Sequence, residues 1–102
     1  MIISTWNVNS IKVRLHAVLQ YLSEENPDVL VLQETKSTDD NFPLNAFIDI
    51  GYHVIFCGQK TYNGVAIISK PKPKGIQINP VSTPENEMRS ISAIYNGIRI
   101  VN

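Results

Sequence analysis

The chain has little of several features that define large classes of proteins. It has one cysteine, Cys57, among 102 residues, which excludes an internal disulfide and fits a reducing cytoplasm. No apolar run approaches the roughly 18–20 residues that a membrane-spanning helix needs. The N-terminal segment "MIISTWNVNS" lacks the basic start and long apolar stretch of a signal peptide. We therefore expect a cytoplasmic protein.

An excess of charge of one sign is also missing. The formal net charge is +0 and the isoelectric point is about 6.7, so composition gives no footprint of nucleic-acid binding. Acidic side chains nevertheless predominate in residues 1–51 and basic ones in residues 52–102. An acidic half could serve a cation and a basic half could serve phosphate. Charge alone favours the simpler explanation, which is solvated surface in both halves.

The first third of the chain has the pattern of a strand, a helix and a second strand. Residues 1–6 are β-branched and aromatic, which predicts a strand. From Ser10, a plausible N-cap, apolar residues recur every three or four positions until Pro27 ends the helical pattern. Residues 29–32 are apolar on both faces, as in a parallel sheet covered on both sides. We therefore expect a βαβ unit.

The rest of the chain is rich in short strands. "SISAIY" and "IRIVN" flank Asn96-Gly97, which predicts a hairpin with a type I′ turn. The other expected elements are a short helix at 43–51, strands at 52–58 and 65–70 joined through Asn63-Gly64, and an edge strand at 76–80. The fold class is therefore α/β of the α+β type: a mixed sheet with one βαβ unit followed by hairpin-linked strands, and helices against one face.

Polar residues follow both strands of the βαβ unit. Asn7 comes just after the first strand and Glu34 just after the second. Parallel strands bring their carboxyl ends to one edge of a sheet, where open α/β sheets place ligands. A carboxylate and an amide oxygen suit Mg²⁺, which keeps several waters and accepts substrate phosphate. A surface Glu34 paired with Lys36 and a turn asparagine at Asn7 is the alternative, and spacing alone favours that alternative.

Other candidates are weaker. The loop "GQKTYNG" carries Gln59 and Lys60, which could hold a phosphate together with main-chain N–H groups, although most such loops only join strands. Arg89 begins a strand, where it could contact a phosphate or be solvated. His16 and His53 have no acid partner near them in the sequence, so a structural or surface role is the better explanation for both.

Four segments together identify a family. They are "STWNVNSIKVR", "PDVLVLQETK", "FPLNAFIDIGYHVIFCGQKTYNGVAIISK" and "MRSISAIYNGIRIVN". In this order and spacing they resemble the N-terminal part of the exodeoxyribonuclease III family, the AP endonuclease branch of the endonuclease/exonuclease/phosphatase superfamily. The resemblance covers residues 1–102. Ser10 departs from the glycine that many relatives have at that position, which concerns mainly the loop and the helix start.

The resemblance implies a fold and a chemistry. The fold is the N-terminal portion of a four-layer αββα sandwich. The chemistry is hydrolysis of phosphodiesters in double-stranded DNA at abasic sites and 3′ ends, with Mg²⁺ or alternatively Mn²⁺ as cofactor. Glu34 and Asn7 would be the catalytic and metal-binding residues. The positions expected to contact DNA are Asn9, Lys36, Gln59, Lys60 and Arg89.

The resemblance also implies that residues 1–102 form an incomplete domain. The family's tyrosine-containing loop, its Asp-x-Asn motif and its Asp-His pair are expected beyond residue 102 and not within it. We therefore expect little activity from these residues alone, and a bare sheet face that favours self-association, whereas the full-length family is monomeric. Two alternatives stay open: a non-catalytic remnant or complementation fragment, and a superfamily phosphatase acting on lipid head groups.

Overall fold

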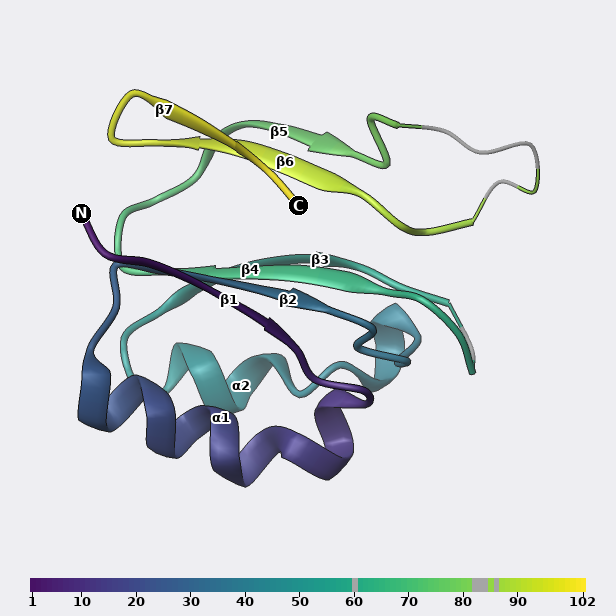
Figure 1. Ribbon diagram of the computed structural model, residues 1–102, viewed down its shortest axis with the longest axis horizontal. Coiled ribbons are helices and arrows are strands. Elements are labelled where there is room, and N and C mark those ends of the chain that lie inside the picture. Colours follow the sequence, from purple (N-terminus) through teal and green to yellow (C-terminus); the bar gives the residue numbers. More distant parts are fainter. Residues whose placement is uncertain (60, 82–84, 86) are drawn as a thin grey trace.

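The chain folds into three stacked layers. The computed structural model describes residues 1–59, 61–81, 85 and 87–102. Figure 1 shows two helices on one side, a four-stranded sheet in the middle and a three-stranded sheet on the other side. The elements are β1 (Ile3–Asn7), α1 (Ile11–Glu25), β2 (Val29–Gln33), the 3₁₀ turn η1 (Asp39–Asn41), α2 (Leu44–Ile48), β3 (His53–Cys57), β4 (Val65–Ser69), β5 (Lys74–Ile78), β6 (Ile91–Tyr95) and β7 (Ile98–Val101).

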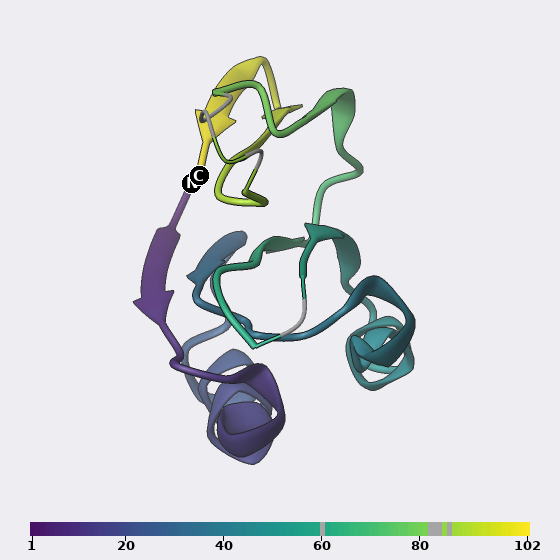
Figure 2. The ribbon, with the colours of Figure 1, turned by 90° about the vertical axis from the view of Figure 1, so that its right-hand side faces the viewer.

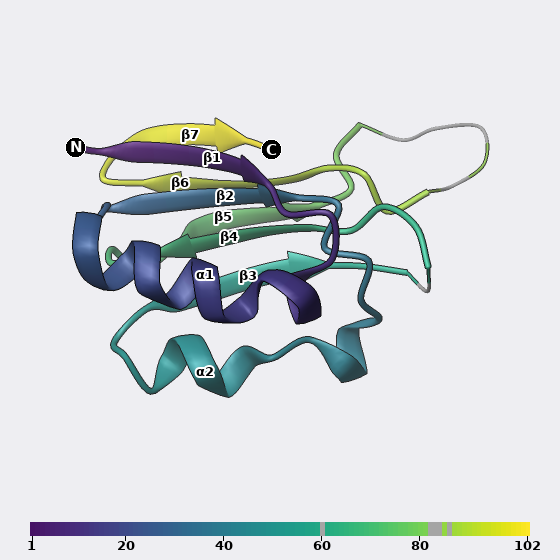
Figure 3. The same cartoon turned by 60° about the horizontal axis from the view of Figure 1, so that its bottom comes forward.

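The middle sheet confirms the predicted βαβ unit. Its strand order is β1-β2-β4-β3, with β1 and β2 parallel and the other neighbours antiparallel. Helix α1 makes the crossover between β1 and β2, and Figure 3 shows both helices lying across the same face of this sheet. The parallel register pairs Asn7 with Gln33. Both strands thus run one residue beyond their expected ends, and their carboxyl ends lie level.

Helix α1 begins and ends as the sequence predicts. The Ser10 hydroxyl accepts a hydrogen bond from the Val13 N–H (3.4 Å), which satisfies one of the free donors of the first turn. At the other end, Asn26 adopts a left-handed conformation (φ 51°) just before Pro27, a common way to stop a helix. No helix in the described part of the chain is long and apolar enough to cross a membrane.

The two central strands bury side chains on both faces. In β2, Leu30 and Leu32 pack toward the helices, whereas Val29 and Val31 pack toward the second sheet. In β4, Ile67 and Ile68 divide in the same way. Fully burying one such side chain contributes roughly 1.5–3 kcal/mol. The unbroken apolar run at 29–32 is therefore explained by a strand that contributes to two cores at once.

The second sheet is a meander of β5, β6 and β7. Asn96 (φ 49°) and Gly97 (φ 81°) form the turn between β6 and β7, which confirms the hairpin and has the two positive φ angles of a type I′ turn. Strand β5 begins earlier than the expected residue 76 and has an irregular register with β6 after Lys74. Helix α2 is shorter than the expected 43–51 and stops at Ile48.

One face of the second sheet has no further layer in the described part of the chain. It differs from the large apolar surface that we expected. Arg99 lies on this face, and its Nη1 donates to the Ser92 hydroxyl (2.9 Å), the Gly75 carbonyl (3.3 Å) and the Gln77 side chain (3.4 Å). The face is therefore partly polar. Self-association through it stays a prediction.

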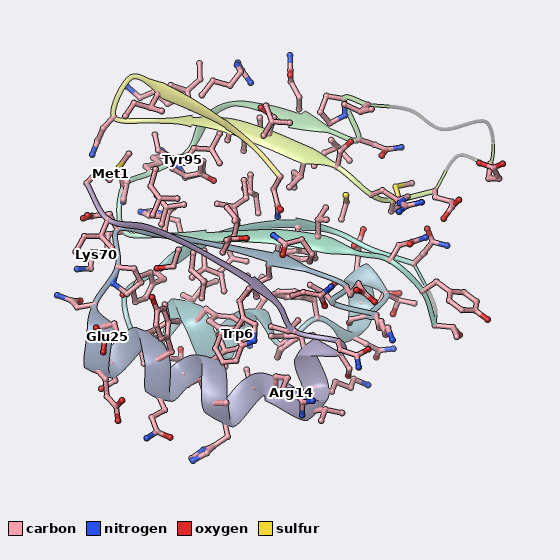
Figure 4. All side chains as sticks on the ribbon, viewed as in Figure 1. Met1, Trp6, Arg14, Glu25, Lys70 and Tyr95 are labelled. Atoms are coloured by element: carbon pink, nitrogen blue, oxygen red, sulfur yellow. The ribbon has the colours of Figure 1, made fainter. Side chains whose placement is uncertain are left out.

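Tyr95 lies between the two sheets, as Figure 4 shows. Its side chain is fully buried, and its hydroxyl makes no hydrogen bond to the described residues. Burial raises the pKa of Tyr95 to about 12, and the neighbouring Ser69 hydroxyl opposes this rise only in part. The Ser69 hydroxyl itself donates to the Pro71 carbonyl (2.7 Å).

Alkaline pH should therefore destabilise the fold through Tyr95. In the unfolded chain the phenol ionises near about pH 10, so the unfolded state loses its proton first, and stability falls as pH rises from about 10 to 12. We expect the free energy of unfolding in urea to fall between about pH 9 and 11 by roughly 1 kcal/mol more in the wild type than in Tyr95→Phe. Equal falls in the two proteins would contradict this assignment.

Candidate cation and phosphate site

The loops after β1 and β2 are joined side by side by main-chain hydrogen bonds. These bonds continue the parallel ladder past the ends of the strands. They run from the Val8 N–H to the Gln33 carbonyl (3.0 Å), from the Ser10 N–H to the Glu34 carbonyl (2.8 Å) and from the Ile11 N–H to the Thr35 carbonyl (2.9 Å). The start of α1 is thereby fixed to the segment that carries Glu34. Figure 2 looks directly onto this edge of the molecule.

Several residues on this edge have a backbone conformation that L-residues seldom adopt. They include Asn9 (φ 46°), Ser10 (φ 94°), Glu34 (φ 53°), Lys36 (φ 51°) and Asn63 (φ 56°). Asparagine tolerates the left-handed region, whereas glutamate and lysine enter it at a cost of roughly 1 kcal/mol or more. Such strained residues cluster at functional sites, because the surrounding structure holds side chains there in directions that regular structure does not provide.

Two further loops complete the edge. The Thr35 N–H donates to the Gly64 carbonyl (3.1 Å), and the Lys36 N–H donates to the Asn63 carbonyl (2.9 Å). The Gly64 N–H donates in turn to the Met88 carbonyl (3.0 Å). The β3–β4 loop and the segment before β6 are therefore attached to the Glu34 segment through the main chain.

The structure brings Asn7 and Glu34 into direct contact, as the spacing predicted. The Asn7 side-chain amide nitrogen donates to Glu34 Oε2, and its oxygen accepts from the Asn9 N–H (3.1 Å). Because that N–H requires an acceptor, the oxygen of Asn7 is held by the loop and its nitrogen faces the carboxylate. In this arrangement Asn7 orients Glu34, and its own oxygen points to the main chain rather than to open space.

Lys36 lies beside the same carboxylate. Its ammonium group donates to Asn9 Oδ1 and lies 3.9 Å from Glu34 Oε1. The Lys36 and Glu34 side chains are 32% and 46% exposed, so the pair is screened by solvent and contributes little to stability. The surface ion pair proposed as the simpler explanation of Glu34 is thus present, and it coexists with the Asn7 contact.

A cleft of about 520 Å³ opens between these loops. Arg89 reaches it from the far side, with its Nη1 3.9 Å from Glu87 Oε2. The cleft is lined by Asn7, Gln33, Glu34, Lys36, Tyr62, Asn63, Gly64, Val65 and Arg89. One acid and two cations among the described residues face it, which is the composition of a site for a cation and an anion together.

One of the predicted contact residues, Gln59, has other surroundings. The side-chain oxygen of Gln59 accepts hydrogen bonds from the Met88 N–H (2.8 Å) and from Asn63 Nδ2 (3.3 Å), and Gln59 does not line the cleft. Gln59 therefore joins the β3–β4 loop to the segment before β6. Lys60 lies outside the described residues. DNA contacts by Gln59 and Lys60 stay predictions.

Sequence reasoning missed several residues of the edge. Gln33 was assigned to neither strand nor site, although it sits in the same motif as Glu34, and Tyr62 and Asn63 were treated only as loop. The sequence of η1, Asp39–Asn41, also fits the pattern Asp-x-Asn, contrary to our expectation that none occurs. Its residues do not line the cleft, so the pattern there is a turn and not a site.

The side chains of the cleft suit Mg²⁺ or Mn²⁺ better than a structural zinc ion. The described residues contain no group of three or more His, Cys, Asp or Glu side chains that could enclose a metal, as a structural zinc site requires. A single carboxylate beside open space suits Mg²⁺ or Mn²⁺, which retain waters and take the remaining oxygens from a phosphate. The donor set therefore fits a hard divalent cation held from one side.

The three layers and the rim of the cleft define a class of protein: a mixed α/β sandwich with an oxygen-rich site at the carboxyl ends of parallel strands. Comparison with known proteins agrees. Residues 4–102 match the Endonuclease/Exonuclease/phosphatase family, and the chain belongs to that family.

Individual relatives are similar along most or all of the chain. The exodeoxyribonuclease III of Haemophilus influenzae is 36% identical over 90 residues, which cover 87% of this chain and 34% of the relative. An AP endonuclease from Archaeoglobus fulgidus is 47% identical with a TM-score of 0.93, and covers 100% of this chain and 40% of its own. A 3′ phosphatase from Neisseria, bound to a product DNA hairpin, is 44% identical with a TM-score of 0.92 over the same shares, 100% and 40%. This chain thus spans about a third of the length of the curated relative.

Gly64 tests how tightly the edge is assembled. A Cβ on Gly64 would lie 2.2 Å from Thr35 Oγ1, whereas a Cβ on Gly51 would meet nothing within 4 Å, and both glycines have nearly the same φ, 89° and 91°. We expect Gly64→Ala to lower the free energy of unfolding by roughly 1–3 kcal/mol more than Gly51→Ala. Urea denaturation of the two variants measures the difference, and equal losses would mean that the strain lies only in φ.

Proposed function

We propose that this chain provides the cation-binding side of a Mg²⁺-dependent DNA-repair nuclease of the cytoplasm, which hydrolyses phosphodiesters at abasic sites and 3′ ends of double-stranded DNA. The observation that carries the proposal is the contact between Asn7 and Glu34 at the rim of the cleft. Asn7 and Glu34 are the two polar residues that we expected the βαβ unit to bring together at a cation.

Glu34 is the residue that would hold the cation, through its carboxylate. Asn7 fixes the direction of that carboxylate by donating to Oε2, so Asn7 contributes by orientation and, through water, by its amide. When bound, a divalent cation supplies positive charge next to a phosphate, which stabilises the negative charge that develops during hydrolysis. Mn²⁺ is an alternative cofactor, since it accepts the same oxygen ligands.

The cations around the cleft would hold the DNA backbone. Lys36 and Arg89 both face the cleft that contains Glu34, and each can bind a phosphate oxygen without reading the base. Asn9 accepts from Lys36 and so sets the direction of its ammonium group. Gln59 would act indirectly, by fixing the loop that carries Lys60. These contacts would position a phosphate between the lysine, the arginine and the carboxylate.

The printed activities of the relatives support the choice of substrate. They include an exodeoxyribonuclease, an AP endonuclease and a 3′ phosphatase with a DNA hairpin as its product. All three are reactions at a phosphate ester of DNA. Because this chain spans about a third of the curated relative, the activity, the substrate and the monomeric state are proposed for the whole protein, of which we propose that residues 1–102 are the N-terminal part.

Cation binding is the first test. Mn²⁺ titrated into the chain and followed by the loss of the free-ion EPR signal should report one site. Glu34→Gln keeps the shape and the contact with Asn7 but removes the charge, and we expect it to weaken binding by more than about tenfold. Glu24→Gln makes the same charge change on the exposed surface of α1 and should have no effect. Equal binding by both variants would disprove the site.

DNA binding is the second test. We expect Lys36→Ala to weaken binding of an abasic duplex and of an intact duplex alike, and to lower the slope of log K against log salt by about 1, since it removes one phosphate contact. Lys70→Ala is the matched control, because Lys70 lies at the opposite edge of the sheet (Figure 4) and donates to the Asn26 carbonyl. Fluorescence anisotropy over a range of salt concentrations measures both. Hydrolysis of an inositol phosphate by the whole protein, without cleavage of abasic DNA, would favour a phosphatase instead.

A further inference from the structure

Asn102 connects the two sheets next to Gln33, which lines the cleft. Its main chain pairs with Ile91 at the start of β6, by hydrogen bonds in both directions (2.8 and 2.9 Å). Its side chain reaches the middle sheet instead. There Nδ2 donates to the carbonyls of Leu32 (2.9 Å) and Ala66 (3.0 Å), and Oδ1 accepts from Gln33 Nε2 (2.8 Å). Every polar atom of this side chain is therefore engaged.

These contacts allow one orientation of the Asn102 amide. The carbonyls of Leu32 and Ala66 can only accept hydrogen bonds, so the group that faces them must be the NH₂. The oxygen of Asn102 is then forced to face Gln33, where it needs a donor. Two main-chain carbonyls thus decide which atom of Asn102 meets Gln33.

The orientation of Gln33 follows from that of Asn102. Gln33 Nε2 donates to Asn102 Oδ1 (2.8 Å) and to Thr5 Oγ1 (3.0 Å), which uses both of its hydrogens. Gln33 lines the cleft next to Glu34, and no described residue donates to its side-chain oxygen. The one atom of the Gln33 amide that stays free is therefore an acceptor, at a fixed place beside the candidate cation site.

We propose that Asn102 is a positioning residue that locks the Gln33 amide, so that Gln33 Oε1 accepts a hydrogen bond from a water or hydroxyl group in the oxygen shell of the divalent cation held by Glu34. The inference rests on the proposed function for the cation and adds two residues to the site. A free amide could rotate and present either its oxygen or its NH₂ group, and only the oxygen can accept from a cation-bound water.

A double-mutant cycle tests the relay. Gln33→Met keeps a side chain of similar length without an acceptor, and Asn102→Ala releases the lock. We expect each to weaken Mn²⁺ binding by about tenfold, the lower end of the effect of groups that orient metal ligands. The double variant should bind no more weakly than either single variant, because both changes remove one interaction. Gln20→Met, which removes the exposed Gln20 contact with Glu24 on α1, is the control and should bind as the wild type does.

A purely structural role for Asn102 predicts a different pattern. It would lower the free energy of unfolding in Asn102→Ala, leave the Mn²⁺ affinity of the folded protein unchanged and make the effects of the two variants independent. That result would overturn the proposal. If Asn102→Ala does not fold, Gln33→Met alone decides, because it leaves the hydrogen bonds from Asn102 to the Leu32 and Ala66 carbonyls in place; unchanged Mn²⁺ affinity in that folded variant would overturn the proposal equally.

An NMR measurement without metal tests the contact between Asn102 and Gln33 independently of cation binding. In the wild type both Gln33 side-chain amide protons are donated, so their NMR signals should exchange slowly with water, at least about tenfold more slowly than those of exposed Gln77. In Asn102→Ala this protection should be lost. If the wild type binds no Mn²⁺ but Asn102→Ala removes the protection, the lock stands and the cation site fails. If the Gln33 signals exchange rapidly in the wild type, the lock itself is wrong.

Discussion

The parallel, in-register pairing of β1 with β2 is the constraint on which the rest of the structure depends. Because Asn7 pairs with Gln33, both strands finish at the same level, and the ladder continues through the loops to the start of α1. A shift of one residue would turn Asn7 to the other face of the sheet. The contact of Asn7 with Glu34, and with it the cation side of the cleft, exists only in this register.

The buried strand β2 supports the strained backbone of the segment that follows it. Leu30 and Val31 fill opposite cores, which rigidly fixes β2 and supports the left-handed backbone that follows this strand at Glu34 and Lys36. Strain of this kind persists only where the surroundings over-determine the conformation. Here the surroundings are main-chain hydrogen bonds from two other loops, one of which is bonded in turn to the segment before β6. The side chains of the site are therefore supported by groups that do not depend on side-chain identity.

The polar side chains at the edge are also oriented before any ligand binds. Glu34 is held by Asn7, Lys36 is held by Asn9, and Gln33 is held by Asn102. In each pair an amide fixes the direction of its partner. Preorganised dipoles and charges of this kind need not reorient when a charged ligand arrives, which is the condition under which they are most effective.

Local pattern determined much of this protein. The apolar run at 29–32, the cap at Ser10 and the turn at Asn96-Gly97 are each specified by neighbouring residues. The order of these local elements in turn predicts the βαβ unit and the joint position of Asn7 and Glu34. Tertiary structure alone decided which way the amides face. The orientation of Asn7 depends on the Asn9 N–H, and that of Gln33 depends on Asn102, 69 residues away. An amide has nearly the same shape either way round, so its direction is set by partners that only the folded chain brings near, and no sequence spacing encodes them.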